Sequence, residues 1–186
     1  DVVQIPIAPD APPGKYEIEV GAYPVGKPGE RLTTDTGDAR VILGALKIAP
    51  RDAERAASNP RTRVNANFSN QVELIGYDVT PSQNTIQLTL YWRARAALDR
   101  DYTVFVHALD ANGKIIAQVD RAPQNGNYPT SLWDTGEQVR DDYALALPPN
   151  SSAQRIVVGL YRADTGERLP VGDSDHVGIN WRGAGQ

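Results

Sequence analysis

The two histidines of the chain are the first candidates for metal or acid-base chemistry. His107 and His176 stand in separate β-like segments, so a metal site built from both would require the fold to bring them together. The alternative for His107, which shares its expected strand face with Thr103 and Phe105, is a half-buried side chain with one ring nitrogen bonded to a neighbour. We favour this structural role, and the sequence predicts no histidine metal site.

Acidic residues gather in several segments that have the composition of loops. Calcium takes about six to eight oxygen ligands, and loops between β-strands can supply them. Asp173 and Asp175, in GDSDHVG, are the candidates for such a site, and Asp35, Asp38 and Asp164 stand in similar segments. Aspartate and glycine also form turns without any metal. We favour plain turns, and no metal or other cofactor is predicted.

The longest irregular segment, QNGNYPTSLWDTGEQV at residues 124–139, carries two aromatic side chains that could meet a sugar. Tyr128 and Trp133 offer flat apolar faces of the kind that stack on pyranose rings while their polar tips stay in water. The alternative is that Trp133 closes the open end of a β-sandwich, with its loop folded over the core. We favour closure and keep Tyr128 and Trp133 as candidate ligand-binding residues.

The constellations that carry common enzymatic reactions are missing or cannot be assigned. The chain has no cysteine, which excludes thiolate chemistry, disulfides and cysteine-based zinc sites. The serine in VGDSDHVG does not follow the strand-turn-helix order of a nucleophile elbow. A carboxylate pair for glycoside hydrolysis would need two residues about 5 to 10 Å apart beside a sugar cleft, and the sequence assigns no such pair. We therefore expect no catalytic residues and no enzyme activity from this chain.

Alternating apolar and polar residues, separated by clusters of Gly, Pro, Asn and Asp, predict antiparallel strands along most of the chain. TIQLTLYWRA is the clearest example, because every second side chain of a strand points to the same face. That segment should be half buried, with Trp92 in the core. The residues of its expected inner face are Ile86, Leu88, Leu90, Trp92 and Ala94.

Two local signals predict connections between these strands. Asn112-Gly113 indicates a two-residue hairpin turn, because both residues tolerate positive φ. Strands that end near Leu109 and start near Lys114 should therefore pair. Only RDAERAASN, at residues 51–59, resembles a helix, and the proline that follows it stops it. We expect a short helical turn in a linker there.

The most informative feature of the sequence is an internal repeat. VQIPIAPDAPPGKYEIEVGAYPVGKPGERL near the start resembles YALALPPNSSAQRIVVGLYRADTGERL near the end. The two stretches are expected to form the same supersecondary element. The matched residues are Val3, Ile5, Ile7, Pro9 and Asp10 with Tyr143, Leu145, Leu147, Pro149 and Asn150; Val20, Gly21 and Tyr23 with Val158, Gly159 and Tyr161; Glu30-Arg31-Leu32 with Glu167-Arg168-Leu169; and Gly44 with Gly178.

The repeat predicts the domain organisation, because the second copy is preceded by some eighty residues that the first copy lacks. We expect residues 1–49 to be the C-terminal half of a preceding repeat, 50–61 a linker, 62–182 a complete domain and 183–186 a tail. A half domain leaves open sheet edges and an uncovered face. Residues 1–49 should therefore pack on residues 62–182 or on another chain, by dimerisation or swapping.

Overall composition argues against several classes of partner. The 19 basic and 23 acidic residues give a net charge of −4 without clustered Lys or Arg, so we expect no nucleic-acid partner. No run approaches the roughly 20 apolar residues that span a bilayer, so we expect no direct membrane insertion of this chain. The absence of methionine leads us to expect an internal piece of a longer protein.

The chain resembles a family of bacterial β-sandwich modules at LIGYDV, LTLYWRA, DYTVFVHALD, YPTSLWDTGEQVRDDYALALP and VVGLYRADTGERLPV. Such modules often occur in tandem, as the soluble C-terminal part of polytopic membrane proteins whose membrane region is similar to dolichyl-phosphate-mannose-type glycosyltransferases. The resemblance covers residues 70–180, and residues 1–49 as the tail of a preceding copy. It implies an extracytoplasmic module, tethered to the cell membrane, and another YPTS-x-W-x-x-GE segment ahead of residue 1.

These features predict an all-β protein with an antiparallel β-sandwich, immunoglobulin-like or jelly-roll-like. The predicted function is that of a non-catalytic accessory or interaction module in a larger, membrane-anchored, glycosyltransferase-like protein. A carbohydrate-binding module that uses Tyr128 and Trp133 is the alternative. The expected partners are other domains of the parent chain, with a glycan as a further candidate.

Overall fold

The structure is a computed structural model that describes residues 3–49, 59–82 and 84–181. It divides into two compact units, Asp1–Ala49 and Pro50–Gln186, and each is described by itself. The short helical turn expected at residues 51–59 lies, except for Asn59, outside the described residues, as does the expected tail at 183–186.

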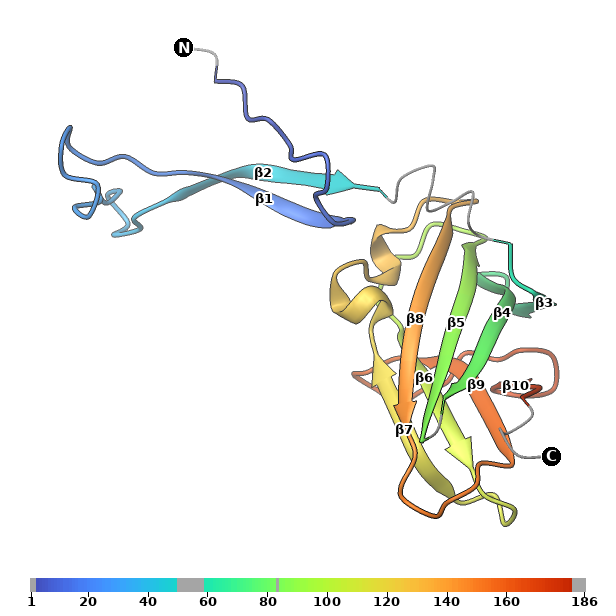
Figure 1. The fold of residues 1–186 in the computed structure, drawn as a ribbon. Coiled ribbons are helices and arrows are strands. Elements are labelled where there is room, and N and C mark those ends of the chain that lie inside the picture. Colours follow the sequence, from blue (N-terminus) through green and yellow to red (C-terminus); the bar gives the residue numbers. More distant parts are fainter. Residues whose placement is uncertain (1–2, 50–58, 83, 182–186) are drawn as a thin grey trace. The chain divides into compact units, whose positions relative to one another are not determined.

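The first unit contains one antiparallel hairpin, formed by β1 (Gly14–Val20) and β2 (Val41–Ile48) (Figure 1). The pairing runs from Gly14 opposite Ile48 to Val20 opposite Val41, with a bulge between Ile18 and Glu19. A two-stranded hairpin has no second layer of its own, so its faces stay largely open.

The second unit consists of two four-stranded antiparallel sheets, in the orders β3-β4-β5-β8 and β10-β9-β6-β7. Figure 1 shows β4, β5 and β8 side by side in one layer, with β6, β7 and β9 behind them. This arrangement confirms the all-β, antiparallel prediction. The elements are β3 (Thr62–Phe68), β4 (Val72–Ser82), β5 (Thr85–Ala94), β6 (Thr103–Leu109), β7 (Ile115–Arg121), η1 (Pro123–Gly126), η2 (Thr130–Leu132), β8 (Gln138–Ala146), β9 (Arg155–Tyr161) and β10 (Val177–Ile179).

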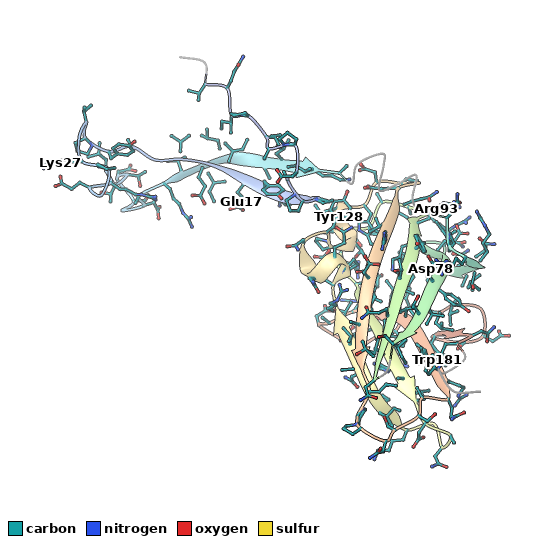
Figure 2. The ribbon with its side chains drawn as sticks, viewed as in Figure 1. Glu17, Lys27, Asp78, Arg93, Tyr128 and Trp181 are labelled. Carbon is teal, nitrogen blue, oxygen red and sulfur yellow. The ribbon has the colours of Figure 1, made fainter. Side chains whose placement is uncertain are left out.

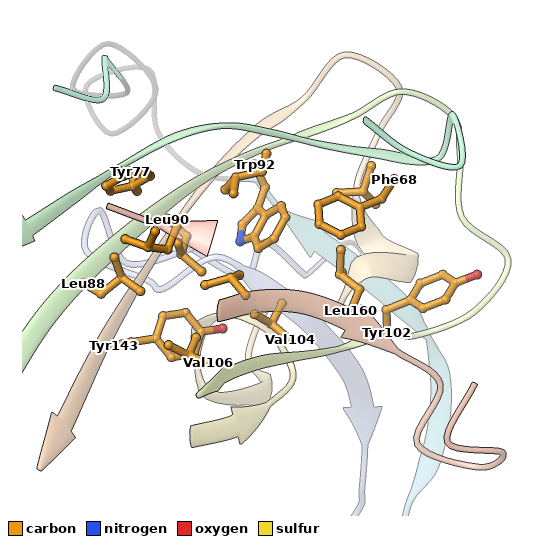
Figure 3. Packing of buried hydrophobic residues seen from close by; sticks show 14 of the residues in the cluster. Phe68, Tyr77, Leu88, Leu90, Trp92, Tyr102, Val104, Val106, Tyr143 and Leu160 are labelled. Carbon is orange, nitrogen blue, oxygen red and sulfur yellow. The ribbon is translucent and has the colours of Figure 1, made fainter. Parts of the chain in front are cut away.

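One hydrophobic core lies between the two sheets of the second unit (Figure 3). The inner face of β5 supplies its centre, as the alternation of TIQLTLYWRA predicts, and Trp92 is fully buried there against Phe68. The opposite sheet contributes Val104, Val106 and Leu160. The two sheets of the second unit therefore share one interior, which is the main stabilising feature of that unit.

The hairpin between β6 and β7 forms where it was predicted but with a different turn. Leu109 pairs with Ile115, as expected for strands that end and start near these positions. Within the turn, only Gly113 has positive φ, so the two-residue turn with positive φ at both positions is wrong. The carboxylate of Asp110 accepts hydrogen bonds from the N–H groups of Asn112 and Lys114, and these bonds stabilise a longer turn with glycine at its last position.

Gly159 on β9 lies opposite Phe105 on β6, where no larger residue fits. A Cβ atom at position 159 would lie 2.5 Å from Cζ of Phe105 and 2.7 Å from the carbonyl oxygen of Asp175. Overpacking of this kind costs about 1–3 kcal/mol. We expect Gly159→Ala to lower the free energy of unfolding by that amount, measured by urea denaturation.

Gly178→Ala is the matched control, because Gly178 lies on the neighbouring strand β10 and a Cβ atom there would meet nothing within 4 Å. Its free energy of unfolding should stay within about 0.5 kcal/mol of the wild type. Equal stabilities of the two variants would contradict the close contact at Gly159.

Candidate functional site

Tyr128 and Trp133 both lie in the core of the second unit, in the loop between β7 and β8; Figure 2 labels Tyr128. Tyr128 is 0% exposed and Trp133 is 2% exposed. The indole N–H of Trp133 donates to the carbonyl oxygen of Tyr128 over 3.1 Å. Stacking on a sugar needs an exposed ring face, and this structure buries both rings, so their arrangement corresponds to the closure alternative.

The remaining residues of the YPTS-x-W-x-x-GE segment hold this loop in place. The carboxylate of Glu137 accepts hydrogen bonds from the Tyr128 hydroxyl, over 2.7 Å, and from the backbone N–H of Asp134, over 2.8 Å. Gly136 has a φ of 85°, which glycine adopts without strain, and its N–H donates to Ala94 at the end of β5. The polar groups of the segment thus bond within the loop and to the neighbouring β5-β6 region, since Thr130 also accepts the N–H of Tyr102.

The two histidines have separate local partners. His107 is 7% exposed and so is buried rather than half-buried, whereas its Nε2 lies 3.0 Å from Oδ1 of Asp120, which confirms the predicted bond to a neighbour. The ring packs beside Phe105, with centroids 4.9 Å apart. Nδ1 of His176 lies 2.7 Å from its chain neighbour Asp175. The structure thus gives each ring a protein partner of its own.

The calcium candidates Asp173 and Asp175 lie in the turn that precedes β10. Hydrogen bonds with His176, over 2.7 Å, and from Arg168, over 2.9 Å, lower the pKa of Asp175. A cation there would compete with a guanidinium that is already in place. Among the described residues, no group of three or more His, Asp or Glu side chains is arranged to hold a metal ion.

A buried charged cluster joins the two sheets at β7 and β8. The Asp141 carboxylate is 1% exposed; its Oδ1 lies 3.1 Å from Nη1 of Arg121 and accepts the backbone N–H of Gln124 over 3.0 Å. Tyr143 donates its hydroxyl to the same carboxylate, and the Arg121 guanidinium lies 4.0 Å above the tyrosine ring. Burial raises the pKa of Asp141 despite these partners.

This cluster was not predicted from the sequence, although the sequence carries a signal for it. Val139, Asp141, Tyr143 and Leu145 share one face of β8, and that face is buried. A carboxylate in the inward phase of a strand needs a buried partner, because an unpaired charge in the core is costly. The partner, Arg121, stands 20 residues earlier, and only the tertiary structure identifies it.

Three loops at one end of the second unit enclose a polar cleft of about 580 Å³, which we call the loop-end cleft. The β3-β4 turn, the β5-β6 loop and the loop after β9 contribute its walls. Its side chains combine arginines and carboxylates above buried apolar residues. The lining includes Gln71, Leu98, Arg100, Tyr102, Arg162 and Leu169.

A second, apolar groove of about 460 Å³ lies on the first unit. Ile5 and Ile7 line it from the segment before β1, Tyr16 and Ile18 line it from β1, and Leu46 lines it from β2. Its side chains Ile5 and Ile7 are exposed on the first unit.

Comparisons of the chain with protein families, with curated proteins and with solved structures gave no match. Within the described residues, no helix combines the length and the apolar character that crossing a membrane requires.

Proposed function

We propose that the chain is a non-catalytic interaction module built from tandem β-sandwich repeats. Residues 1–49 are the C-terminal half of one copy, and the second unit is a complete copy. The observation that carries this proposal is the agreement of backbone hydrogen bonds between the hairpin of the first unit and the β9-β10 region of the second.

Two backbone hydrogen bonds recur at matched positions of the two copies. They involve residues at or just beyond the end of the first strand of each pair, where the chain turns back, and they have equal lengths in the two copies. This agreement supports a duplicated backbone as well as a duplicated sequence. The bonds run from Leu32 N–H to Ala22 O and from Leu169 N–H to Leu160 O, each 2.8 Å, and from Thr34 N–H to Asp38 O and from Val171 N–H to Ser174 O, each 2.8 Å.

The strand pairing agrees as well, because Val20 pairs with Val41 and the matched Val158 pairs with Val177. The next pair along corrects one match of the sequence comparison. Gly178 corresponds by register to Ile42 and not to Gly44, because Gly178 directly follows Val177 and Ile42 directly follows the matched Val41. The pairs behind this correction are Gly178 with Val157, Ile42 with Glu19 and Gly44 with Ile18.

Burial separates the two copies where the proposal expects it. Tyr143 and Leu145 on β8 are 3% and 1% exposed, whereas their counterparts Val3 and Ile5 are 80% and 66% exposed. In the complete copy β8 pairs with β5, and β9 pairs with β6. We infer that the apolar groove of the first unit is the surface on which the β3 to β7 half of a preceding copy packs.

The wider context of this proposal comes from the resemblance of the sequence to membrane-tethered bacterial modules. We place the module outside the cytoplasm, in a larger glycosyltransferase-like protein, where other domains of the parent chain are its partners. Swapping between chains through residues 1–49 is the alternative mode of assembly. Carbohydrate binding by Tyr128 and Trp133 would require the closure loop to open.

A fused protein tests the proposal directly. A second copy of residues 59–142 is joined ahead of Val3, which restores the order in which residue 142 precedes Tyr143. We expect amide hydrogen exchange at Leu32 and Val41 to slow by at least about a hundredfold, because an isolated hairpin opens readily whereas core strands exchange only on unfolding.

Two variants of the fused protein provide the control. Ile5→Asp should abolish the slowed exchange, because its counterpart Leu145 is buried in the complete copy. Gln4→Asp should retain it, because its counterpart Ala144 points outward. Unchanged exchange in the fused protein, or equal effects of the two substitutions, would rule out the proposed packing.

A further inference from the structure

The loop-end cleft has the size of a small-molecule site and a mainly polar lining. Its volume of about 580 Å³ falls within the range of about 300–1,000 Å³ that is usual for ligand pockets. It lies at the end of a sandwich-like fold, where loops carry function while the sheets hold them in place. The cleft belongs wholly to the second unit, so it is independent of how the first unit is covered.

Every arginine that lines the cleft forms an ion pair with a carboxylate that is close to it in the sequence. Arg100 binds Asp99 with two hydrogen bonds of 2.8 Å. Arg162 binds Asp164 over 2.7 Å and approaches Glu167 to 3.6 Å. These pairings lower the pKa values of Asp99 and Asp164.

The arginine-carboxylate pairs also influence one another across the cleft. The charge of Arg162 contributes to the lowered pKa of Asp99, after the larger effect of the hydrogen bond from Arg100. Arg168 is neutralised by Asp175, 2.9 Å away. A free anion would be repelled by the carboxylates as well as attracted by the arginines, so its net electrostatic attraction to the cleft would be small. A neutral ligand avoids the repulsion from the carboxylates.

A ligand with several hydroxyl groups matches this lining. Each hydroxyl both donates and accepts, so one group can accept from a guanidinium and donate to the neighbouring carboxylate. Gln71 adds an amide, which already accepts the hydroxyl of Tyr102 over 2.9 Å. Buried Leu98 and Leu169 supply an apolar floor for the C–H face of a ring.

We propose that the loop-end cleft binds a neutral sugar ring, with Arg100 and Arg162 as the hydrogen-bonding groups of its rim. This site differs from Tyr128 and Trp133, which are buried. It would give the interaction module a carbohydrate ligand without any catalytic group.

Nuclear magnetic resonance of the ¹⁵N-labelled full chain tests the proposal. D-mannose, D-galactose and N-acetyl-D-glucosamine are titrated separately to millimolar concentrations, with sodium sulfate as the anion probe. We expect at least one sugar to shift the amides of residues 97–102 and 162–170 in a saturable manner. Arg100→Ala should weaken the affinity for that sugar about tenfold or more, because hydrogen bonds to charged groups are strong.

Arg140→Ala is the matched control, since both arginine side chains are 45% exposed and both pair with a nearby aspartate. It should bind the sugar like the wild type. Ala97→Trp, which fills the cleft from an exposed position, should abolish binding even if loss of Arg100 disturbs its loop. The proposal is overturned if none of the three sugars gives saturable shifts, if the shifts lie elsewhere, or if sulfate produces the same shifts more tightly.

Discussion

Replacing Asp141 with alanine should lower the free energy of unfolding by about 3–5 kcal/mol, because it breaks a buried ion pair and leaves one charge behind. The Arg121 side chain is only 18% exposed and would lose its carboxylate partner. The N–H of Gln124 and the hydroxyl of Tyr143 would lose an acceptor as well. Chemical denaturation followed by tryptophan fluorescence measures this loss.

Asp142→Ala is the control for this prediction, because Asp142 is the next residue but its side chain is 60% exposed and pairs with Arg140 on the surface. Exposed pairs contribute about 0–1 kcal/mol, so this variant should stay close to the wild type. A loss at Asp142 as large as that at Asp141 would show that the buried cluster is not what stabilises β8.

The pH dependence of stability provides a second readout of Asp141. Burial raises its folded pKa, so the folded state binds more protons than the unfolded state between the ordinary and the raised value. The free energy of unfolding should therefore fall as the pH rises through that window. Asp141→Asn removes this titration, so the difference in stability between wild type and variant should favour the wild type most at the acidic end. A difference that is constant with pH would contradict the raised pKa.

Replacing Trp133 with alanine should also cost about 3–5 kcal/mol, because it removes the largest side chain of the closure loop from a packed core. The cavity would lie under the segment that Glu137 and Gly136 tie to β5. Trp133→Phe retains most of the volume and loses only the N–H bond to Tyr128, so it should cost about 1 kcal/mol more than its volume change alone.

Thermal unfolding and sugar titration of Trp133→Ala together separate closure from carbohydrate binding. We expect a lower melting temperature and no specific loss of a ligand contact. A variant that kept its stability but lost binding of a sugar would favour the carbohydrate alternative for Trp133 instead.

Strands were predictable from the sequence where period-two alternation is strict. β5 is the best example, because its apolar residues share one buried face. Turn geometry was less predictable: the Asp110 carboxylate bonds two backbone N–H groups and selects a longer turn than Asn112-Gly113 alone indicates. Local patterns therefore determine the strand, while side-chain bonds determine how it ends.

The candidate sites were less accessible to sequence reasoning than the strands. Aromatic loop residues such as Tyr128 and Trp133 are compatible both with an exposed surface that stacks on sugars and with a loop that closes the end of the sandwich. Only the burial of the two rings in the structure distinguishes these alternatives. The loop-end cleft depends on three loops that are far apart in sequence, such as those of Gln71 and Arg162. No spacing rule brings such residues together, because their approach is a property of the packed sheets.

In the tandem arrangement that we propose, the pairing of Arg121 with Asp141 affects how neighbouring copies assemble. It lies at the seam between the first five strands of a copy and the last three, and the repeat aligns Asp1 with Asp141. Each half of a copy would then contribute one residue of the buried ion pair. Because the arginine would come from one half and the aspartate from the other in every copy, halves of neighbouring copies could exchange without leaving a buried charge unpaired, so this ion pair would permit swapped assembly.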